Sequence, residues 1–176
     1  MIKESKCVLC QEEAKVSSVP GKDAYFIECD TCGHYLFASP ELFERGYIEM
    51  SREKRAMLSA YTRNLFEHGE EPPELGDPDL LKEIIADYEN KKAGEKLKNL
   101  IWYTRKKSSQ FGDSVPFNTE KDYPITYSLS PQGFTDILNS PIGLNLIVPT
   151  ESGLKLTGEG WKLGNELMGS GEESEQ

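Results

Sequence analysis

The four cysteines of the chain form two Cys-x-x-Cys motifs, which is the pattern of a structural zinc site. Cys7 and Cys10 make the first motif, Cys29 and Cys32 make the second, and eighteen residues separate them. Four thiolates can surround Zn²⁺ tetrahedrally when each pair comes from one tight turn and a hairpin brings the two turns together. We therefore predict one structural Zn²⁺ per chain, bound by Cys7, Cys10, Cys29 and Cys32.

The four cysteines have two other interpretations: they could form two disulfides, or they could remain thiols that bind no ligand. A reducing compartment favours metal over disulfides. His34 follows the second motif closely and could replace a cysteine as ligand, but four cysteines already complete a tetrahedral shell. A shell of four protein ligands leaves no open position for water, so the predicted role of the zinc is structural.

The residues between the motifs have the pattern of a β-hairpin. Residues 14–19 and 24–29 are rich in strand-forming residues, and residues 20–23 between them are typical of a turn. A third strand is expected over residues 34–38. The sequence therefore predicts a zinc ribbon over residues 1–39, made of a hairpin and a third strand.

A helical connector is predicted over residues 40–69. Its first helix is short and ends near Gly46, and its second begins after Ser51, has an apolar stripe and ends at Gly69. Three polar residues of the second helix could form a site: Tyr61, Arg63 and His68. We favour the interpretation in which the helix packs its stripe and its arginines, including Arg63, are solvated.

Residues 70–78 are predicted to be a linker, because adjacent prolines, a glycine and acidic residues support neither helical nor strand periodicity. Beyond this linker we expect three amphipathic helices, a two-stranded hairpin and a closing helix, at residues 81–88, 94–104, 130–139, 144–156 and after Thr157.

This order of elements is typical of a winged helix-turn-helix, so such a domain is predicted over residues 79–169. The acidic residues 170–176 are expected to be disordered. The predicted fold class is therefore α+β, with a small four-cysteine zinc ribbon followed by helices and a winged-helix-like domain.

The composition indicates in which compartment the protein works and which classes of partner it can bind. The chain is 37% hydrophobic and 28% charged, with a formal net charge of −10. An acidic chain is repelled by nucleic acid unless its basic residues gather in one place. No run approaches the roughly eighteen apolar residues of a membrane span, and the first residues lack the apolar core of a signal peptide. We therefore expect a cytoplasmic protein with no membrane partner.

Several short stretches carry a resemblance: the two cysteine motifs, Pro-Gly-Lys-Asp-Ala-Tyr at residues 20–25, Asp-Tyr-Pro at 122–124 and Leu-Thr-Gly-Glu-Gly-Trp at 156–161. Together they resemble uncharacterised bacterial proteins. In that group a zinc ribbon and a winged-helix-like module precede an effector domain similar to Toll/interleukin-receptor or nucleoside deoxyribosyltransferase folds. The chain departs from that group in that it stops where the effector would begin, so the catalytic activity of the group is not carried over. The resemblance implies a sensor or adaptor part in a bacterial defence or signalling context.

Catalysis is not predicted. The chain has two histidines, its four cysteines are assigned to metal, and it lacks a phosphate-binding glycine motif and a serine nucleophile elbow. We expect a non-catalytic adaptor or sensor that binds a protein partner. Candidate interaction residues are aromatic and lie outside any strong amphipathic period: Phe117, Tyr123 and Tyr127. Tyr123 and Tyr127 could instead pack inside the winged helix.

The alternative function is nucleic-acid binding of the transcription-regulator type. Duplex DNA is not the expected partner, because the predicted third helix (131–139) has no Arg or Lys and the hairpin tip (150–153) is acidic. The basic stretch 91–107, next to Trp102 and Tyr103, could bind single strands by stacking. Its candidate residues are Lys96, Lys98, Arg105, Lys106 and Lys107. Basic residues at a helix end also complement the helix dipole.

Overall fold

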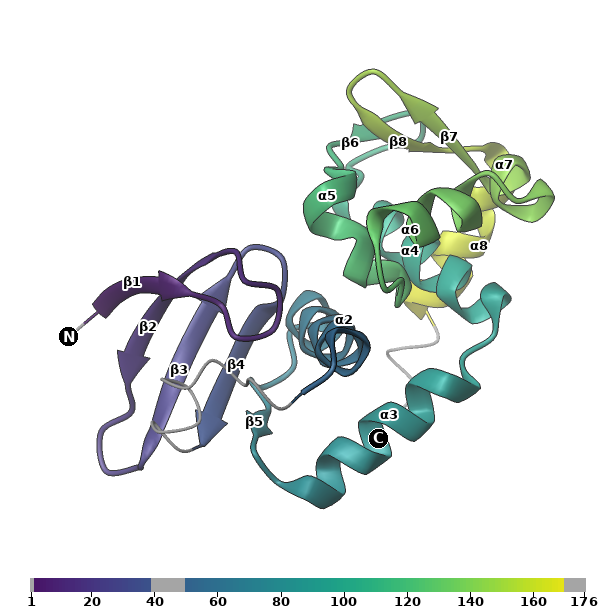
Figure 1. Ribbon diagram of the computed structural model, residues 1–176. Helices are drawn as coiled ribbons and strands as arrows, with labels where there is room; N and C mark the ends of the chain where they lie inside the picture. The colour runs from purple at the N-terminus through teal and green to yellow at the C-terminus, as the bar shows by residue number, and fades with distance from the viewer. Residues whose placement is uncertain (1, 39–49, 170–176) are drawn as a thin grey trace. The chain divides into compact units, whose positions relative to one another are not determined.

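The computed structural model describes residues 2–38 and 50–169 (Figure 1). The predicted short helix near residues 40–46 and the tail 170–176 lie outside these residues. The described chain is α+β, and it divides into two compact units. The first comprises Met1–Asn90 with Tyr127–Leu129, and the second comprises Lys91–Thr126 with Ser130–Gln176.

The first unit is built on a five-stranded mixed sheet. Its strands follow one another in the order β1-β2-β3-β4-β5, and their bounds are Ile2–Lys6, Glu13–Ser18, Ala24–Cys29, Gly33–Ala38 and Glu74–Leu75. The first four strands are antiparallel, whereas β5 pairs in parallel with β4. The predicted hairpin and third strand are thus present as β2, β3 and β4, and β1 and β5 extend the sheet beyond the prediction.

The described part of the first unit also contains two helices, α2 (Arg52–His68) and α3 (Pro78–Asn90). The hydroxyl of Ser51 accepts a hydrogen bond from the Lys54 amide at the start of α2, and Gly69 ends the helix with a φ of 78°. Both ends agree with the local sequence signals. The apolar core of this unit includes residues of β3, β4, β5, α2 and α3: Ile27, Tyr35, Phe37, Leu75, Leu58 and Ile84.

The stretch predicted as a linker, residues 70–78, is part of the first unit. Leu75 is fully buried, and the Leu36 amide donates to the Pro73 carbonyl at 2.8 Å. Two proline residues are compatible with this short edge strand because an edge leaves backbone groups unpaired on one side. The boundary between the compact units accordingly falls after Asn90, and α3 belongs to the first unit rather than to the predicted domain 79–169.

The second unit combines a small three-stranded sheet with helices. In chain order its elements are α4 (Ala93–Lys107), β6 (Ser114–Val115), α5 (Thr119–Asp122), η1 (Tyr123–Thr126), α6 (Pro131–Leu138), α7 (Pro141–Leu146), β7 (Ile147–Thr150), β8 (Gly153–Leu156) and α8 (Gly158–Gly169). The strands lie in the order β6-β8-β7 and are antiparallel. The core contains Leu100, Ile101, Ile125, Phe134 and Ile147.

The prediction of the first strand of the 144–156 hairpin is partly wrong. Leu144 and Leu146 belong to α7, and the strand begins at Ile147. Helix α7 starts because Pro141 occupies its first turn and the Ser140 hydroxyl accepts from the Gly143 amide at 3.0 Å. None of the helices in residues 2–38 and 50–169 is long and apolar enough to cross a membrane.

Candidate metal centre

The four cysteine sulfurs converge on one point of the first unit. All four Sγ atoms lie within 4.8 Å of one another. The distance from Cys7 Sγ to Cys32 Sγ is 3.6 Å, and that from Cys10 Sγ to Cys29 Sγ is 3.5 Å. Four thiolates bonded at about 2.3 Å to a tetrahedral ion are about 3.8 Å apart. A disulfide needs about 2.05 Å, and all four thiols are free. The geometry therefore fits a metal ion and contradicts the disulfide alternative.

The sheet brings the two motifs together. The first motif lies between β1 and β2, where the Cys7 amide donates to the Glu12 carbonyl at 2.7 Å. The second motif joins β3 to β4, because Cys29 ends one strand and Gly33 begins the next. Since Ala14 of β2 is paired with Cys29 of β3, both turns lie at the same end of the sheet.

Each motif is followed by a residue whose backbone lies in the left-handed region of φ and ψ. Gln11 follows Cys10 with a φ of 68°, and Gly33 follows Cys32 with a φ of 74°. In the first turn the Gln11 amide donates to the Cys7 carbonyl at 2.9 Å. The two motifs therefore form similar turns, although only the second has the glycine that this backbone conformation favours.

Two hydroxyl groups contact the sulfur cluster. The Tyr35 hydroxyl is 3.1 Å from Cys7 Sγ, and the Ser59 hydroxyl is 3.1 Å from Cys32 Sγ. Burial raises the pKa of Tyr35, and the nearby Cys7 thiolate raises it further. Neither residue is predicted from the sequence, because both lie outside the motifs and reach the sulfurs from β4 and α2.

The thiol pKa values diverge because the four groups share protons. Hydrogen bonds from Cys10, Cys29 and Cys32 lower the pKa of Cys7, and a hydrogen bond from Cys10 lowers that of Cys29. Burial raises the pKa of Cys32. A cation among the sulfurs would allow all four to ionise together, which is the state that metal binding requires.

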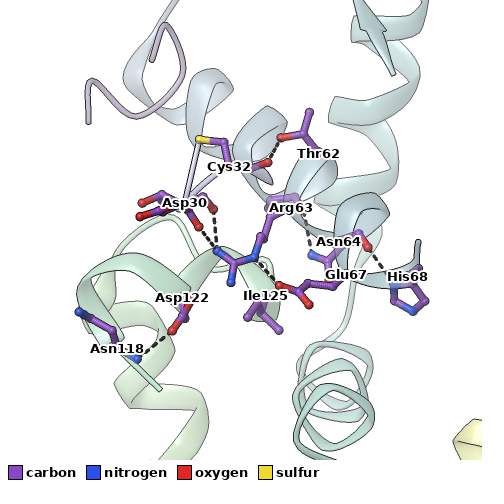
Figure 2. Close-up of polar contacts among 12 residues, drawn as sticks. Asp30, Cys32, Thr62, Arg63, Asn64, Glu67, His68, Asn118, Asp122 and Ile125 are labelled. Carbon is purple, nitrogen blue, oxygen red and sulfur yellow. Dashed lines mark hydrogen bonds and ion pairs between the residues drawn. The ribbon is translucent and has the colours of Figure 1, made fainter. Parts of the chain in front are cut away.

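Helix α2 donates side-chain hydrogen bonds to the backbone of the second motif (Figure 2). The Thr62 hydroxyl donates to the Cys32 carbonyl at 2.7 Å. Nη1 of Arg63 donates to the carbonyls of Asp30 and Thr31, the latter at 3.2 Å. Nε of Arg63 donates to the Glu67 carboxylate at 3.0 Å. Three consecutive carbonyls of the turn thus accept from one helix.

The expectation that Arg63 is solvated is therefore wrong. Its side chain is 7% exposed, because the carbonyls of the turn and Glu67 provide the partners that its guanidinium needs when buried. The i,i+4 spacing of Arg63 and Glu67 is the one sequence signal for this pair. The other two residues of the suggested polar site have different surroundings. Tyr61 packs against the core, and the His68 ring forms a hydrogen bond with the Asn64 carbonyl.

His34, the alternative ligand, is outside the group of metal-binding side chains among the described residues. Its ring centroid lies 4.3 Å from that of Phe66, and its Nε2 is 3.9 Å from the Glu28 carboxylate.

The candidate nucleic-acid residues all lie on α4, but they differ in exposure. Arg105 packs over Trp161 at 4.0 Å, and its Nε donates to Asn165 at 2.6 Å, so it attaches α8 to α4. Burial lowers the pKa of the half-buried Lys96, as does the nearby Lys91. The other three residues are exposed: Lys98, Lys106 and Lys107.

The three candidate interaction residues are half-buried and belong to different units. In the second unit Phe117 stacks on Phe134 with a centroid distance of 4.6 Å, and Tyr123 packs against the core. In the first unit the Tyr88 hydroxyl donates to the Tyr127 carbonyl. Burial raises the pKa of Tyr127 to about 12.

The sulfur cluster is thus the clearest chemical feature of the described chain. Four soft sulfur ligands can hold one metal ion, and the two motif turns fix their positions. Comparisons of the chain with protein-family models, with curated proteins and with solved structures find no match.

Proposed function

We propose that Cys7, Cys10, Cys29 and Cys32 bind one structural Zn²⁺. The sulfur separations of 3.5 and 3.6 Å carry this proposal, because they approach the edge length of a zinc–thiolate tetrahedron. When bound, the ion would cross-link the two motifs and balance part of the thiolate charge. The ribbon has a small core of its own, so much of its stability would come from the metal.

Elemental analysis of the purified chain tests the identity of the metal. We expect one equivalent of zinc and its loss in a Cys7→Ser, Cys10→Ser double variant. A stoichiometric amount of iron would contradict zinc, and the absence of any metal would contradict the site.

We further propose that the protein is a non-catalytic adaptor or sensor that acts through a protein partner. The second unit supports a winged-helix-like interpretation, since α4, β6, α5, α6, β7 and β8 follow in that order and β8 lies between β6 and β7. In such a fold α6 and the β7–β8 turn would face DNA.

The observation that carries the adaptor proposal is the charge of these two surfaces. Helix α6 includes Asp136 and no Arg or Lys, and the β7–β8 turn includes Glu151. Both would repel phosphate, so a protein is the better partner. The bacterial defence or signalling setting is the one that the sequence resemblance implies.

The second candidate function, binding of single-stranded nucleic acid, is favoured by one ridge of α4. Lys98, Trp102 and Lys106 are spaced four residues apart and therefore lie on one side of the helix. The Lys106 ammonium lies 4.8 Å from the centre of the Trp102 ring. A base could stack on an aromatic ring between two cations. Arg105 does not contribute, since it attaches α8.

Electrophoretic mobility shift separates the two functions. The assay uses random duplex and single-stranded DNA at about 50 mM salt, because low salt strengthens even weak electrostatic binding. We expect no shift at micromolar protein. A shift that Lys98→Glu and Lys106→Glu abolish would make nucleic-acid binding the better function. Affinity capture with the tagged full chain then tests the adaptor function, which predicts a stoichiometric protein partner.

A further inference from the structure

The four cysteines of the metal centre differ in how far they are shielded from solvent. Cys7 and Cys32 have a relative exposure of 0%, and Cys29 is 5% exposed. Cys10 is half-buried, whereas the other three are buried. Of the four, Cys10 is therefore the most accessible to a reagent that diffuses in from solvent.

Two of the four sulfurs also have a hydroxyl group beside them. The Tyr35 hydroxyl is 3.1 Å from Cys7 Sγ, and the Ser59 hydroxyl is 3.1 Å from Cys32 Sγ. Tyr35 and Ser59 are buried, so water competes little for these contacts. A sulfur that binds a metal ion is a thiolate and has no proton to donate. In the metal-loaded centre the hydroxyl is therefore the donor of each pair.

The sulfurs of Cys10 and Cys29 have no such hydroxyl donor among residues 2–38 and 50–169. Their short contact is with each other, at 3.5 Å. A charge-assisted hydrogen bond stabilises a thiolate and weakens when the sulfur forms a new bond, so it lowers the reactivity of that sulfur. A thiolate without a donor is the better nucleophile. Greater exposure and the missing donor thus select the same residue, Cys10.

We propose that the Cys10 thiolate is a modification site at which a small carbon electrophile removes one ligand from the metal centre, while the hydroxyls of Tyr35 and Ser59 hold the thiolates of Cys7 and Cys32. The inference rests on the proposed structural Zn²⁺ and specifies how that site is regulated.

The reaction can be written for iodoacetamide, which serves as the probe. The Cys10 sulfur forms a bond to carbon, the carbon–iodine bond breaks, and iodide leaves with its electron pair. The product is a neutral thioether in place of the thiolate that binds the metal. Three thiolates then remain, so the metal should be released more readily.

The first experiment treats the purified, metal-loaded full chain with iodoacetamide and follows each cysteine by mass spectrometry. Fragment ions distinguish the two cysteines of each motif. We expect Cys10 to be modified at least about tenfold faster than Cys7 and Cys32. A chromogenic chelator in the same solution should report metal release at the rate of Cys10 modification.

The second experiment tests the hydroxyls, and the chain offers a matched control. Tyr35→Phe and Ser59→Ala should each weaken zinc binding about tenfold in competition with a chelator. In the Co²⁺-loaded protein both should shift the sulfur-to-metal charge-transfer band to longer wavelength, because a thiolate without a donor gives up an electron more easily. Tyr61→Phe removes a hydroxyl from α2 that contacts none of the four sulfurs, so it should change neither quantity. A purely structural role of Tyr35 would not move the band.

The outcomes separate this inference from the zinc proposal. A purified chain without metal rejects both. A metal-loaded chain in which all four cysteines react equally, or in which Cys7 or Cys32 reacts first, rejects the modification site alone. So does modification of Cys10 without metal release. An unchanged charge-transfer band in Tyr35→Phe rejects the role of the hydroxyls, and if that variant does not fold, Ser59→Ala decides the same point.

Discussion

The two Cys-x-x-Cys motifs form similar turns, but the protein holds them in different ways. The first motif is stabilised locally, since the Gln11 side chain donates to the carbonyls of Cys7 and Val8, each at 3.2 Å. The second motif is held by α2, from which Thr62 and Arg63 donate to its carbonyls. One turn thus depends on its own residues and the other on the packing of a distant helix.

Gly33 shows how close that packing is. A Cβ at this position would lie 2.6 Å from Phe66 Cβ and 3.2 Å from the Thr62 carbonyl oxygen. The equivalent residue of the first motif, Gln11, is exposed. Two motifs with the same cysteine spacing therefore contribute differently to stability, and substitutions in the second should be the more damaging. Four predictions follow from this asymmetry.

Removal of the metal should have the largest effect. Structural zinc contributes on the order of 10 kcal/mol to small domains, so chelation should unfold the first unit. Among single variants, Cys32→Ser should lower the melting temperature more than Cys10→Ser, because Cys32 is fully buried against Ser59 and Cys10 is partly exposed. Circular dichroism with and without a chelator measures both effects. An unchanged melting temperature after chelation would rule out a structural metal.

Arg63→Met should have the next largest effect. The variant removes the ion pair with the buried Glu67 carboxylate and a donor to two carbonyls of the second motif, which should cost about 3–5 kcal/mol of unfolding free energy. The double variant Arg63→Met, Glu67→Leu should recover part of this loss, because the buried carboxylate is then removed together with the guanidinium. Urea unfolding of the full cycle measures the coupling. Equal losses in the single and double variants would locate the main contribution in the carbonyl contacts instead.

Gly33→Ala comes third, and the chain offers a matched control. At Gly33 an alanine would suffer both the positive φ and the contact with Phe66, whereas at Gly69, with a φ of 78°, a Cβ meets no described atom within 4 Å. We expect a cost of about 1 kcal/mol for Gly69→Ala and about 2–4 kcal/mol for Gly33→Ala. Similar costs in urea unfolding would mean that α2 yields to the added methyl group.

Local signals predicted the parts of this site that lie close in sequence. The cysteine spacing predicted the sulfur cluster, the turn residues 20–23 predicted the hairpin, and Ser51 and Gly69 predicted the ends of α2. Each of these features depends on backbone conformation or ligand chemistry within a few residues. The fold class, α+β, follows from such features together.

Features that depend on tertiary approach were missed. Nothing near Arg63 or Ser59 in the sequence indicates that the second motif lies against that face of α2. Leu144 and Leu146 have the alternation of a strand, but the helix start at Ser140 and Pro141 overrides it. Residues 70–78 have the composition of a linker, and only the burial of Leu75 shows that they complete the sheet.

The smallest predicted effect is at Gln11, where two contributions oppose each other. Gln11→Gly relieves the positive φ of 68°, worth roughly 1 kcal/mol, and loses two side-chain hydrogen bonds that are partly exposed, worth about 0.5 kcal/mol each. The free energy of unfolding should therefore change by less than about 1 kcal/mol. Gln11→Ala keeps the strain and loses the bonds, so it should destabilise the protein by about 1 kcal/mol. If Gln11→Gly proves as damaging as Gly33→Ala, the first motif also depends on packing that its own residues do not provide.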